Sequence, residues 1–318
     1  MEKSEDNLVA WIASRSPSNA SDAPIGIGDD MAMVRLAGSH LLLTTDMLMD
    51  GVDFDAAVHP PDMVGRKALA VGLSDCAAMA VRPRWALVSV ALPNDWSIEQ
   101  AMQLHAGIRL LADEYQVALI GGDTNSWDHP LVIDLVLAAE PWPQVKPVTR
   151  RGMRPGDAIW VSGALGGSIQ GRHLNFRPRV EEAHQLAATL GDCLHAMMDL
   201  SDGLSTDAHR MAAASGCGIE LDEAALEAVA SEDSKLAVRT DGQTLLHHVL
   251  NDGEDFELFY AVAGAGPREV RRTEAAGASP TPLTRIGVAV SGPGVWLRRT
   301  DKSREKIEPR GWQHFTSP

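Results

Sequence analysis

Cysteine is scarce in this chain of 318 residues, which contains only Cys76, Cys193 and Cys217. An odd number of cysteines at such wide spacing excludes a disulfide framework and does not match the ligand spacing of a tetrahedral zinc site. We therefore expect three packed thiols in a protein of a reducing cytoplasm.

Positive charge is also in short supply, because 28 lysine and arginine residues stand against 43 aspartate and glutamate residues, a formal net charge of −15. Binding to the phosphate backbone of a nucleic acid needs a surplus of cations, so this balance excludes nucleic acid as the main partner. An anionic small molecule remains compatible with the charge if metal ions or local cations screen its site.

Long apolar segments are missing as well. No run approaches the ~18 residues that a membrane-spanning helix needs. The first residues, MEKSEDNLVAWIASRS, lack the basic start and apolar core of a secretory signal. The sequence thus predicts neither membrane insertion nor export, and we expect a cytoplasmic protein.

The sequence does contain alternating strand and helix patterns, which predict an α/β fold. Apolar runs with strand character occupy residues 41–45, 85–92, 117–121, 131–138, 157–163, 256–262 and 285–290. Helices are expected over 62–80, 97–116 and 203–216; the first is apolar on most faces, the second begins with a Ser97/Gln100 capping box, and the third ends at Gly216. The proline-rich basic segment 141–157 predicts two domains, residues 1–145 and 146–318.

Aspartates recur where predicted strands end, and this pattern is the main functional signal. Asp29 and Asp30 are adjacent in the segment IGIGDDMAM, and Asp46, Asp123, Asp199 and Asp202 follow apolar runs. Each one alone is also typical of an N-cap or a turn. Because ligands gather at strand ends in open α/β sheets, we expect several of these carboxylates to converge.

Asp75 lies in the middle of the predicted buried helix, where an unpaired carboxylate would be costly. An ion pair with Arg66 or Lys67 is one explanation, and coordination of a metal ion is the other. A set of oxygen ligands from aspartates, with the hydroxyl groups of Thr44, Thr45 and Ser201 nearby, favours Mg²⁺.

A magnesium–carboxylate site indicates phosphate chemistry, most often with a nucleoside triphosphate. The sequence contains neither the P-loop motif nor the protein-kinase motifs. The glycine-rich run 162–171 follows a predicted strand, and it is either a phosphate-binding loop or a flexible turn. Another type of ATP-binding fold is therefore needed.

Eight motifs along the chain resemble the bacterial thiamine-monophosphate kinase family in order and spacing: GIGDDMAM, TTDMLMDGVDF, GRKALAVGLSDCAAMA, LIGGDT, TRRGMRPGD, MDLSDGLSTD, DGEDFELFY and GWQHFTSP. This family is part of the superfamily of aminoimidazole ribonucleotide synthetase, selenophosphate synthetase and a hydrogenase maturation protein. The resemblance implies an N-terminal ATP- and magnesium-binding domain whose sheet forms a homodimer, and a C-terminal α/β domain that closes over the nucleotide and the substrate.

The resemblance also implies site residues for ATP, several Mg²⁺ ions and thiamine monophosphate. Metal ligands would be Asp30, Thr44, Thr45, Asp46, Asp75, Asp123, Asp199 and Asp202. Gly122, Asp123, Arg150 and Ser201 would bind ATP, while Asp53, Glu254 and Trp312 would contact the substrate. The implied reaction is direct in-line transfer of the γ-phosphoryl group to an ionised phosphate oxygen, so no general base is required, and Arg150 would act electrostatically.

Three positions depart from the family pattern. Asp53 replaces a histidine, Asp252 replaces a glycine and Gly72 replaces an asparagine, and the segment after Gly171 is short. Asp53 leaves the identity of the substrate open. The alternatives are another ATP-dependent kinase or synthetase of the superfamily that acts on a different phosphorylated heterocycle, or a nucleotide-binding relative without catalytic activity.

Overall fold

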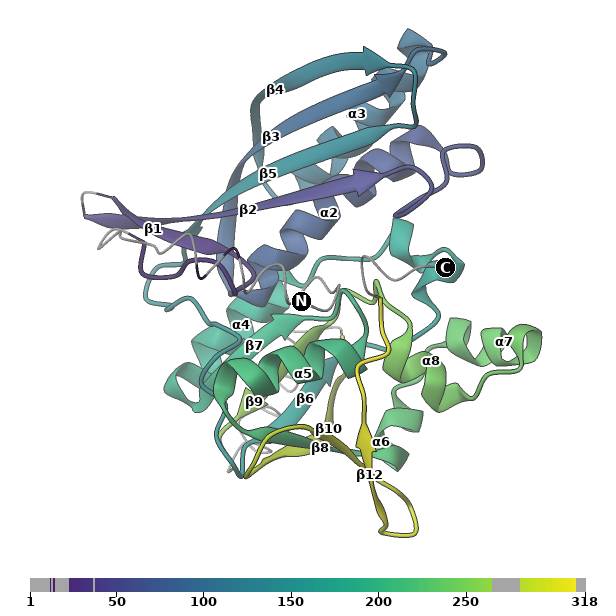
Figure 1. Cartoon of the computed structure of the whole chain (residues 1–318). Coiled ribbons are helices and arrows are strands. Elements are labelled where there is room, and N and C mark those ends of the chain that lie inside the picture. Colours follow the sequence, from purple (N-terminus) through teal and green to yellow (C-terminus); the bar gives the residue numbers. More distant parts are fainter. Residues whose placement is uncertain (1–11, 13, 15–22, 37, 265–280, 313–318) are drawn as a thin grey trace.

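The computed structural model describes residues 12, 14, 23–36, 38–264 and 281–312. Their chain forms two mixed β-sheets, one from each half of the sequence (Figure 1). The first has the strand order β1 (Ala32–Leu36), β2 (Ser39–Met49), β5 (Val132–Pro141), β3 (Val81–Pro93) and β4 (Ala118–Trp127). Its strands are antiparallel except for the parallel pair β3 and β4.

The second sheet has the order β12 (Arg304–Ile307), β11 (Val295–Arg298), β8 (Gly218–Asp222), β10 (Leu283–Val290), β6 (Ala158–Ser162), β9 (Leu258–Val262) and β7 (Leu194–Asp199). Its strands β6 and β9 are buried at every position because both faces of the sheet are covered. Trp160 and Tyr260 belong to the hydrophobic core shared with the first half of the chain, whereas Ile159 and Phe259 belong to a second core on the opposite face. This second core includes α5 (Leu204–Ser215) and α8 (Leu245–Asn251).

Helix α2 (Pro61–Ala78) connects the two halves. It packs on β2, β3 and β5 of the first sheet and on β7 and α4 (Val180–Leu190) of the second half. A helix enclosed in this way must be apolar around most of its circumference, which explains its run of small residues between Gly65 and Ala78. The prediction of a buried helix at 62–80 is confirmed.

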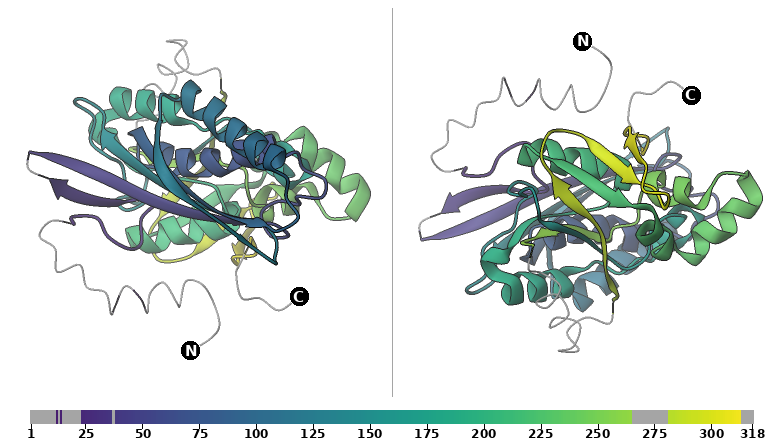
Figure 2. Two further views of the ribbon diagram at one scale, coloured as in Figure 1. Left: turned by 90° about the horizontal axis from the view of Figure 1, so that it is seen from above. Right: turned by 90° about the horizontal axis from the view of Figure 1, so that it is seen from below.

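Helix α3 (Ile98–Glu114) lies beside α2, and both cover the same face of the first sheet (Figures 1 and 2). Its predicted capping box is present, since Ser97 and Gln100 each accept a hydrogen bond from the other's backbone N–H. The remaining helices are α6 (Glu223–Ala228) and α7 (Glu232–Asp241), with 3₁₀ turns η1 (Ser168–Gln170), η2 (Arg172–Leu174) and η3 (Gly191–Cys193).

The seven predicted strands all coincide with observed ones, and α5 ends at Gly216 in the left-handed conformation, as expected. The prediction of three packed thiols is wrong in one case: Cys76 and Cys217 are buried, but Cys193 is exposed because it lies in the η3 turn. None of the described helices combines the length and the hydropathy needed to cross a membrane. The domain boundary at residue 145 stays a prediction.

Two glycines allow α2 and α3 to approach each other closely. A Cβ atom on Gly107 would lie 1.8 Å from the carbonyl oxygen of Asp62, and one on Gly65 would lie 2.0 Å from that of Leu104.

We predict that Gly107→Ala lowers the free energy of unfolding by about 1–3 kcal/mol, because the helices must separate. Urea denaturation measures this loss, and Gln103→Ala on the exposed face of α3 should change stability by less than about 0.5 kcal/mol. An equal effect of both variants would contradict the close contact as the cause.

Candidate active site

Three of the predicted metal ligands meet between the two sheets. Asp30 precedes β1, Asp75 lies on α2 and Asp199 ends β7, and one carboxylate oxygen of each lies within 4.8 Å of the others. The contact of α2 with both sheets brings them together, because Asp75 lies on the helix that packs against β7. The expected convergence of carboxylates is confirmed for these three residues.

Burial and mutual repulsion dominate the electrostatics of this carboxylate group. Burial raises the pKa of Asp75 well above its ordinary value, and Asp46, Asp199 and Asp30 raise it further. Burial, followed by the charge of Asp30, raises the pKa of Asp199 to about 7. Thr44 donates its hydroxyl hydrogen bond to Asp75, and Ser74 donates to Asp199 at 2.5 Å. The group therefore favours either protons or a cation.

Arg150 supplies positive charge at one edge of the group. Its Nη2 lies 2.6 Å from Oδ1 of Asp30, and its Nε lies 3.9 Å from Oδ1 of Asp29. Within the described residues, neither lysine nor arginine pairs with Asp75. The explanation of Asp75 by a salt bridge is thus wrong, because Arg66 binds the carbonyl oxygen of Phe176 and Lys67 binds Glu254.

Two buried oxygens in this region, Oδ2 of Asp30 and Oδ2 of Asp46, have no hydrogen-bond partner. Burial, then the charges of Asp134 and Asp53, raises the pKa of Asp46 to about 7. Buried polar atoms without partners are rare in folded proteins and call for an explanation. Carboxylate and hydroxyl oxygens are the donors that hard divalent cations prefer, so the residues present fit such an ion.

A cavity of about 950 Å³ opens beside the carboxylate group and takes walls from both halves of the chain. Eight residues predicted for the site line it: Thr45, Asp46, Asp53, Arg150, Ser201, Asp202, Glu254 and Trp312. Met47, Leu48, Val52, Val71 and Phe256 add apolar surface. A small molecule with both charged and apolar parts is suited to such a lining.

The C-terminal wall is fixed by a close approach of two segments. A Cβ atom on Gly311 would lie 1.9 Å from the carbonyl oxygen of Asp202, so only glycine fits there. Trp312 then donates its backbone N–H to the same oxygen at 2.9 Å, and half of its surface remains exposed at the cavity. Asp202 itself lies outside the group of three carboxylates and pairs with Arg210.

Gly122 and Asp123 lie on the edge strand β4, and they are not among the described residues that line the cavity.

The pairing of β3 with its two neighbouring strands points to Asp134, a carboxylate that the sequence analysis missed. Ser89 on β3 pairs with Asp123 on one side and with Asp134 of β5 on the other. Asp134 accepts a hydrogen bond from Thr45 at 3.0 Å and lies near Asp46. The sequence feature that could have indicated Asp134 is its charge, which stands alone within the apolar run 131–138.

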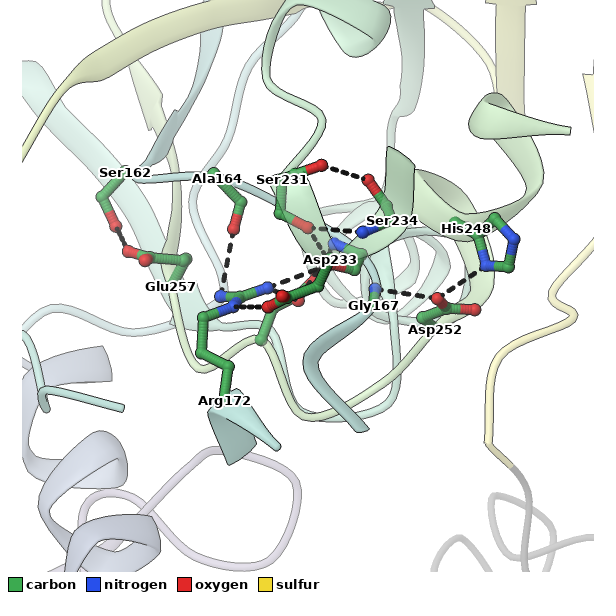
Figure 3. Close-up of polar contacts among 12 residues, drawn as sticks. Ser162, Ala164, Gly167, Arg172, Ser231, Asp233, Ser234, His248, Asp252 and Glu257 are labelled. Atoms are coloured by element: carbon green, nitrogen blue, oxygen red, sulfur yellow. Dashed lines mark hydrogen bonds and ion pairs between the residues drawn. The ribbon is translucent and has the colours of Figure 1, made fainter. Parts of the chain in front are cut away.

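The two acidic departures from the family pattern hold backbone segments in place. Asp53 accepts a hydrogen bond from the backbone of Met49 at 2.7 Å and so stabilises its own turn. Asp252 accepts one from Gly167 at 2.8 Å and lies 2.8 Å from Nδ1 of His248 (Figure 3). At the third departure, a Cβ atom on Gly72 would lie 2.7 Å from Leu135, so the helix approaches the sheet closely.

The glycine-rich segment 162–171 is not an open phosphate cradle. Gly166 donates its N–H to Asp255 and Gly167 donates to Asp252, so carboxylates occupy the positions that an anion would take. A Cβ atom on Gly167 would lie 2.4 Å from the backbone nitrogen of Ser234. Gly166 and Gly167 therefore serve close packing against α8 and α7.

Both halves of the chain are similar to known protein families. A family model for the N-terminal domain of AIR synthase related proteins matches residues 28–139, and the model for their C-terminal domain matches residues 157–295. The thiamine-monophosphate kinase of Rhodopirellula baltica is 39% identical over 98% of this chain and 97% of its own length. That of Salmonella typhimurium is 32% identical over 99% of both.

Solved structures agree with these relatives. AaThiL complexed with AMPPCP and TMP has a TM-score of 0.80 at 29% identity, covering 98% of this chain and 97% of that one. The hydrogenase maturation protein HypE from E. coli has a TM-score of 0.71 at 20% identity, over 96% and 98%. At 20% identity, the similarity to HypE is one of fold alone.

We predict that Asp75→Asn has opposite effects with and without divalent cations. In EDTA at pH 8 the variant should unfold at a higher temperature than the unaltered protein, with a gain of about 1–2 kcal/mol, because one buried charge is removed. The amide oxygen still accepts the hydrogen bond of Thr44. Millimolar Mg²⁺ should then stabilise the unaltered protein but not the variant. Thermal unfolding measures both effects, and equal stabilisation of the two proteins by Mg²⁺ would exclude Asp75 as a ligand.

Proposed function

This chain belongs to the thiamine-monophosphate kinase family, and we propose how its residues carry out the ATP-dependent phosphorylation of thiamine monophosphate. The observation that carries the proposal is the convergence of Asp30, Asp75 and Asp199 beside a cavity shared by both halves. The product is thiamine diphosphate. An ionised oxygen of the substrate phosphate forms the new P–O bond, and the bond from the γ-phosphorus to the bridging oxygen of ADP breaks.

In this proposal, the residues that would hold Mg²⁺ ions are Asp30, Thr44, Thr45, Asp46, Asp75, Asp123, Asp199 and Asp202. Bound there, the ions would screen the repulsion between the phosphates of ATP and the phosphate of the substrate. The unpartnered oxygens of Asp30 and Asp46 support this assignment. Arg150 adds a fixed cation, since burial acts to lower its pKa but the charge and hydrogen bond of Asp30 raise it. Because the attacking oxygen is already ionised, no side chain acts as a general base.

The nucleotide would contact Gly122, Asp123, Arg150 and Ser201. Arg150 and Ser201 line the cavity, and Ser201 is held by the hydrogen bond that its carbonyl oxygen accepts from Glu254 at 2.6 Å. These residues position the γ-phosphoryl group in line with the acceptor, and positioning supplies much of the catalysis in such reactions.

The substrate would contact Asp53, Glu254 and Trp312. Trp312 is half exposed and lines the cavity, and an indole ring can stack on a heterocycle. The carboxylate of Asp53 is engaged with the backbone of Met49, which limits its repulsion of the substrate phosphate. This local role supports thiamine monophosphate as the acceptor despite the departure at position 53.

We also propose that residues 1–145 form a dimerisation domain, with 146–318 closing over the nucleotide, in a cytoplasmic homodimer. None of the described helices covers the face of the first sheet opposite α2 and α3 (Figure 1). Leu87 and Met49 are 40% and 42% exposed in this sheet. A second copy of the sheet would bury this apolar surface.

Turnover tests the function. The purified protein, given ATP, Mg²⁺ and thiamine monophosphate, should form thiamine diphosphate and ADP in equal amounts. Asp46→Asn should lower kcat by about a hundredfold or more, because it removes a charge that acts on the transferred group. Asp128→Asn, at an exposed turn, is the control and should retain activity. ADP formation only with a different phosphorylated heterocycle would indicate another reaction of the superfamily, and ATP binding without turnover would indicate a non-catalytic relative.

Sedimentation equilibrium tests the dimer. The protein should sediment at twice the mass of its chain, and Leu87→Glu should shift it to the monomer, because two carboxylates would be buried at the interface. Leu236→Glu, which changes an exposed leucine on α7, should leave the dimer intact. A monomer in the unaltered protein would refute the proposal.

A further inference from the structure

A lysine that the function does not yet account for lies completely buried beside the cavity. Lys67 on α2 has no exposed side-chain surface, although lysines are almost never buried unless they are paired. Its Nζ lies 2.6 Å from Oε1 of Glu254, 2.5 Å from the carbonyl oxygen of Asp53 and 2.9 Å from Nδ1 of His173. The oxygens of Glu254 and Asp53 accept two hydrogens of the ammonium group. Nδ1 of His173 cannot accept from Lys67 and donate to Glu254 at the same time, and its proton is assigned to the side of Glu254.

Lys67, His173 and Glu254 form a cluster in which the first two residues hold the carboxylate of Glu254 from two sides. Its Oε1 faces Lys67, and its Oε2 lies 3.0 Å from Nδ1 of His173. Burial acts to raise the pKa of Glu254, but the hydrogen bond of His173 and the charge of Lys67 outweigh it, and the pKa is lowered. The glutamate side chain is 22% exposed, whereas those of Lys67 and His173 are 0% and 2% exposed. Glu254 is therefore the most exposed member of the cluster at the cavity, which Lys67 also lines.

The cluster joins parts of the chain that are distant in sequence. Lys67 comes from the first half of the chain, whereas His173 in η2 and Glu254 after α8 come from the second. The turn that carries His173 is anchored by its neighbour Arg172, which donates to the carbonyl oxygen of Ala164 (Figure 3). Arg172 also binds the carbonyl oxygen of Gly166 and the carboxylate of Asp255. The hydrogen bonds of Arg172 therefore fix the position of the His173 imidazole beside Glu254.

The backbone around Glu254 is strained, which distinguishes this ion pair from an ordinary structural one. Glu254 has a φ of 62° and Phe256 a φ of 50°, both in the left-handed region that non-glycine residues seldom adopt. Strain of this kind persists where surrounding contacts fix the chain, and it clusters at functional sites. Both residues line the cavity.

We propose that Lys67 and His173 are positioning residues that keep the Glu254 carboxylate ionised and fix its orientation, so that its remaining lone pairs accept hydrogen bonds from the amino group of the substrate. This inference rests on the proposed function. A carboxylate offers about four lone-pair sites, and the two neighbours use two of them. The other sites belong to a side chain that lines the cavity and is 22% exposed. Orientation by supporting residues makes a binding group effective.

Steady-state kinetics on the full-length protein test this role. Lys67→Met should raise KM for thiamine monophosphate about tenfold or more, because an unpaired buried glutamate takes up a proton. KM for ATP should stay unchanged, which separates a positioning role from a general loss of structure. His173→Leu should have a smaller effect of the same kind, and His173→Gln should restore near-normal KM because its amide N–H replaces the imidazole donor. Lys235→Met, which breaks the exposed Lys235–Glu232 pair, is the matched control and should change neither constant.

A double-mutant cycle decides whether Lys67 acts through Glu254. If it does, adding Lys67→Met to Glu254→Gln should raise KM for thiamine monophosphate no further. Independent multiplication of the two effects, or an equal rise in KM for ATP, would overturn the inference. Binding of an ATP analogue and thermal unfolding verify that each variant is folded.

Failure of the function can be told apart from failure of the inference. If the unaltered protein does not phosphorylate thiamine monophosphate, the proposed function fails. Calorimetric titration then measures the dissociation constant of thiamine monophosphate and so tests the role of the cluster separately. A dissociation constant that Lys67→Met leaves unchanged, or no binding to the unaltered protein, would overturn the inference too.

Discussion

Repulsion among buried carboxylates is the constraint on which the rest of this molecule depends. Asp30, Asp75 and Asp199 lie within 4.8 Å of one another, and Asp46 adds a further buried charge close by. Arg150 offsets part of this repulsion. A chain holds such a group together only if many other contacts fix its segments, and α2, enclosed by both sheets, provides those contacts. The glycines that let α2 approach its neighbours therefore contribute to the site.

The fold could largely be predicted, because its signals are local. The capping box at Ser97, the left-handed Gly216 and the apolar runs of the central strands each depend on a few adjacent residues. The turns and small helices of the second half were less accessible, because short 3₁₀ elements have little periodicity. Cys193 shows the same limit, since its exposure results from a turn that no pattern indicated.

The site was predictable only in part, because its contacts join distant residues. The resemblance to a known family indicated which aspartates would gather, and the residues alone indicated their chemistry. Lys67 was considered as a partner for Asp75, which lies on the same helix, yet its partner Glu254 is 187 residues away. Asp134 was missed because it is the one charged residue of the apolar run 131–138, which predicts a strand but does not show that this strand lies beside β2 and Thr45.

The occupied N–H groups of the glycine-rich segment have a consequence for inhibitor design. A phosphate mimic aimed at Gly166 and Gly167 would have to displace the carboxylates of Asp255 and Asp252 and would leave Arg172 and His248 with fewer partners. Compounds that place an aromatic ring against Trp312 and a hydrogen-bond donor against Glu254, the residues proposed for the substrate, would leave the carboxylates of Asp255 and Asp252 in place. The selective part of a ligand for this enzyme is thus best built on its acceptor end rather than on a triphosphate surrogate.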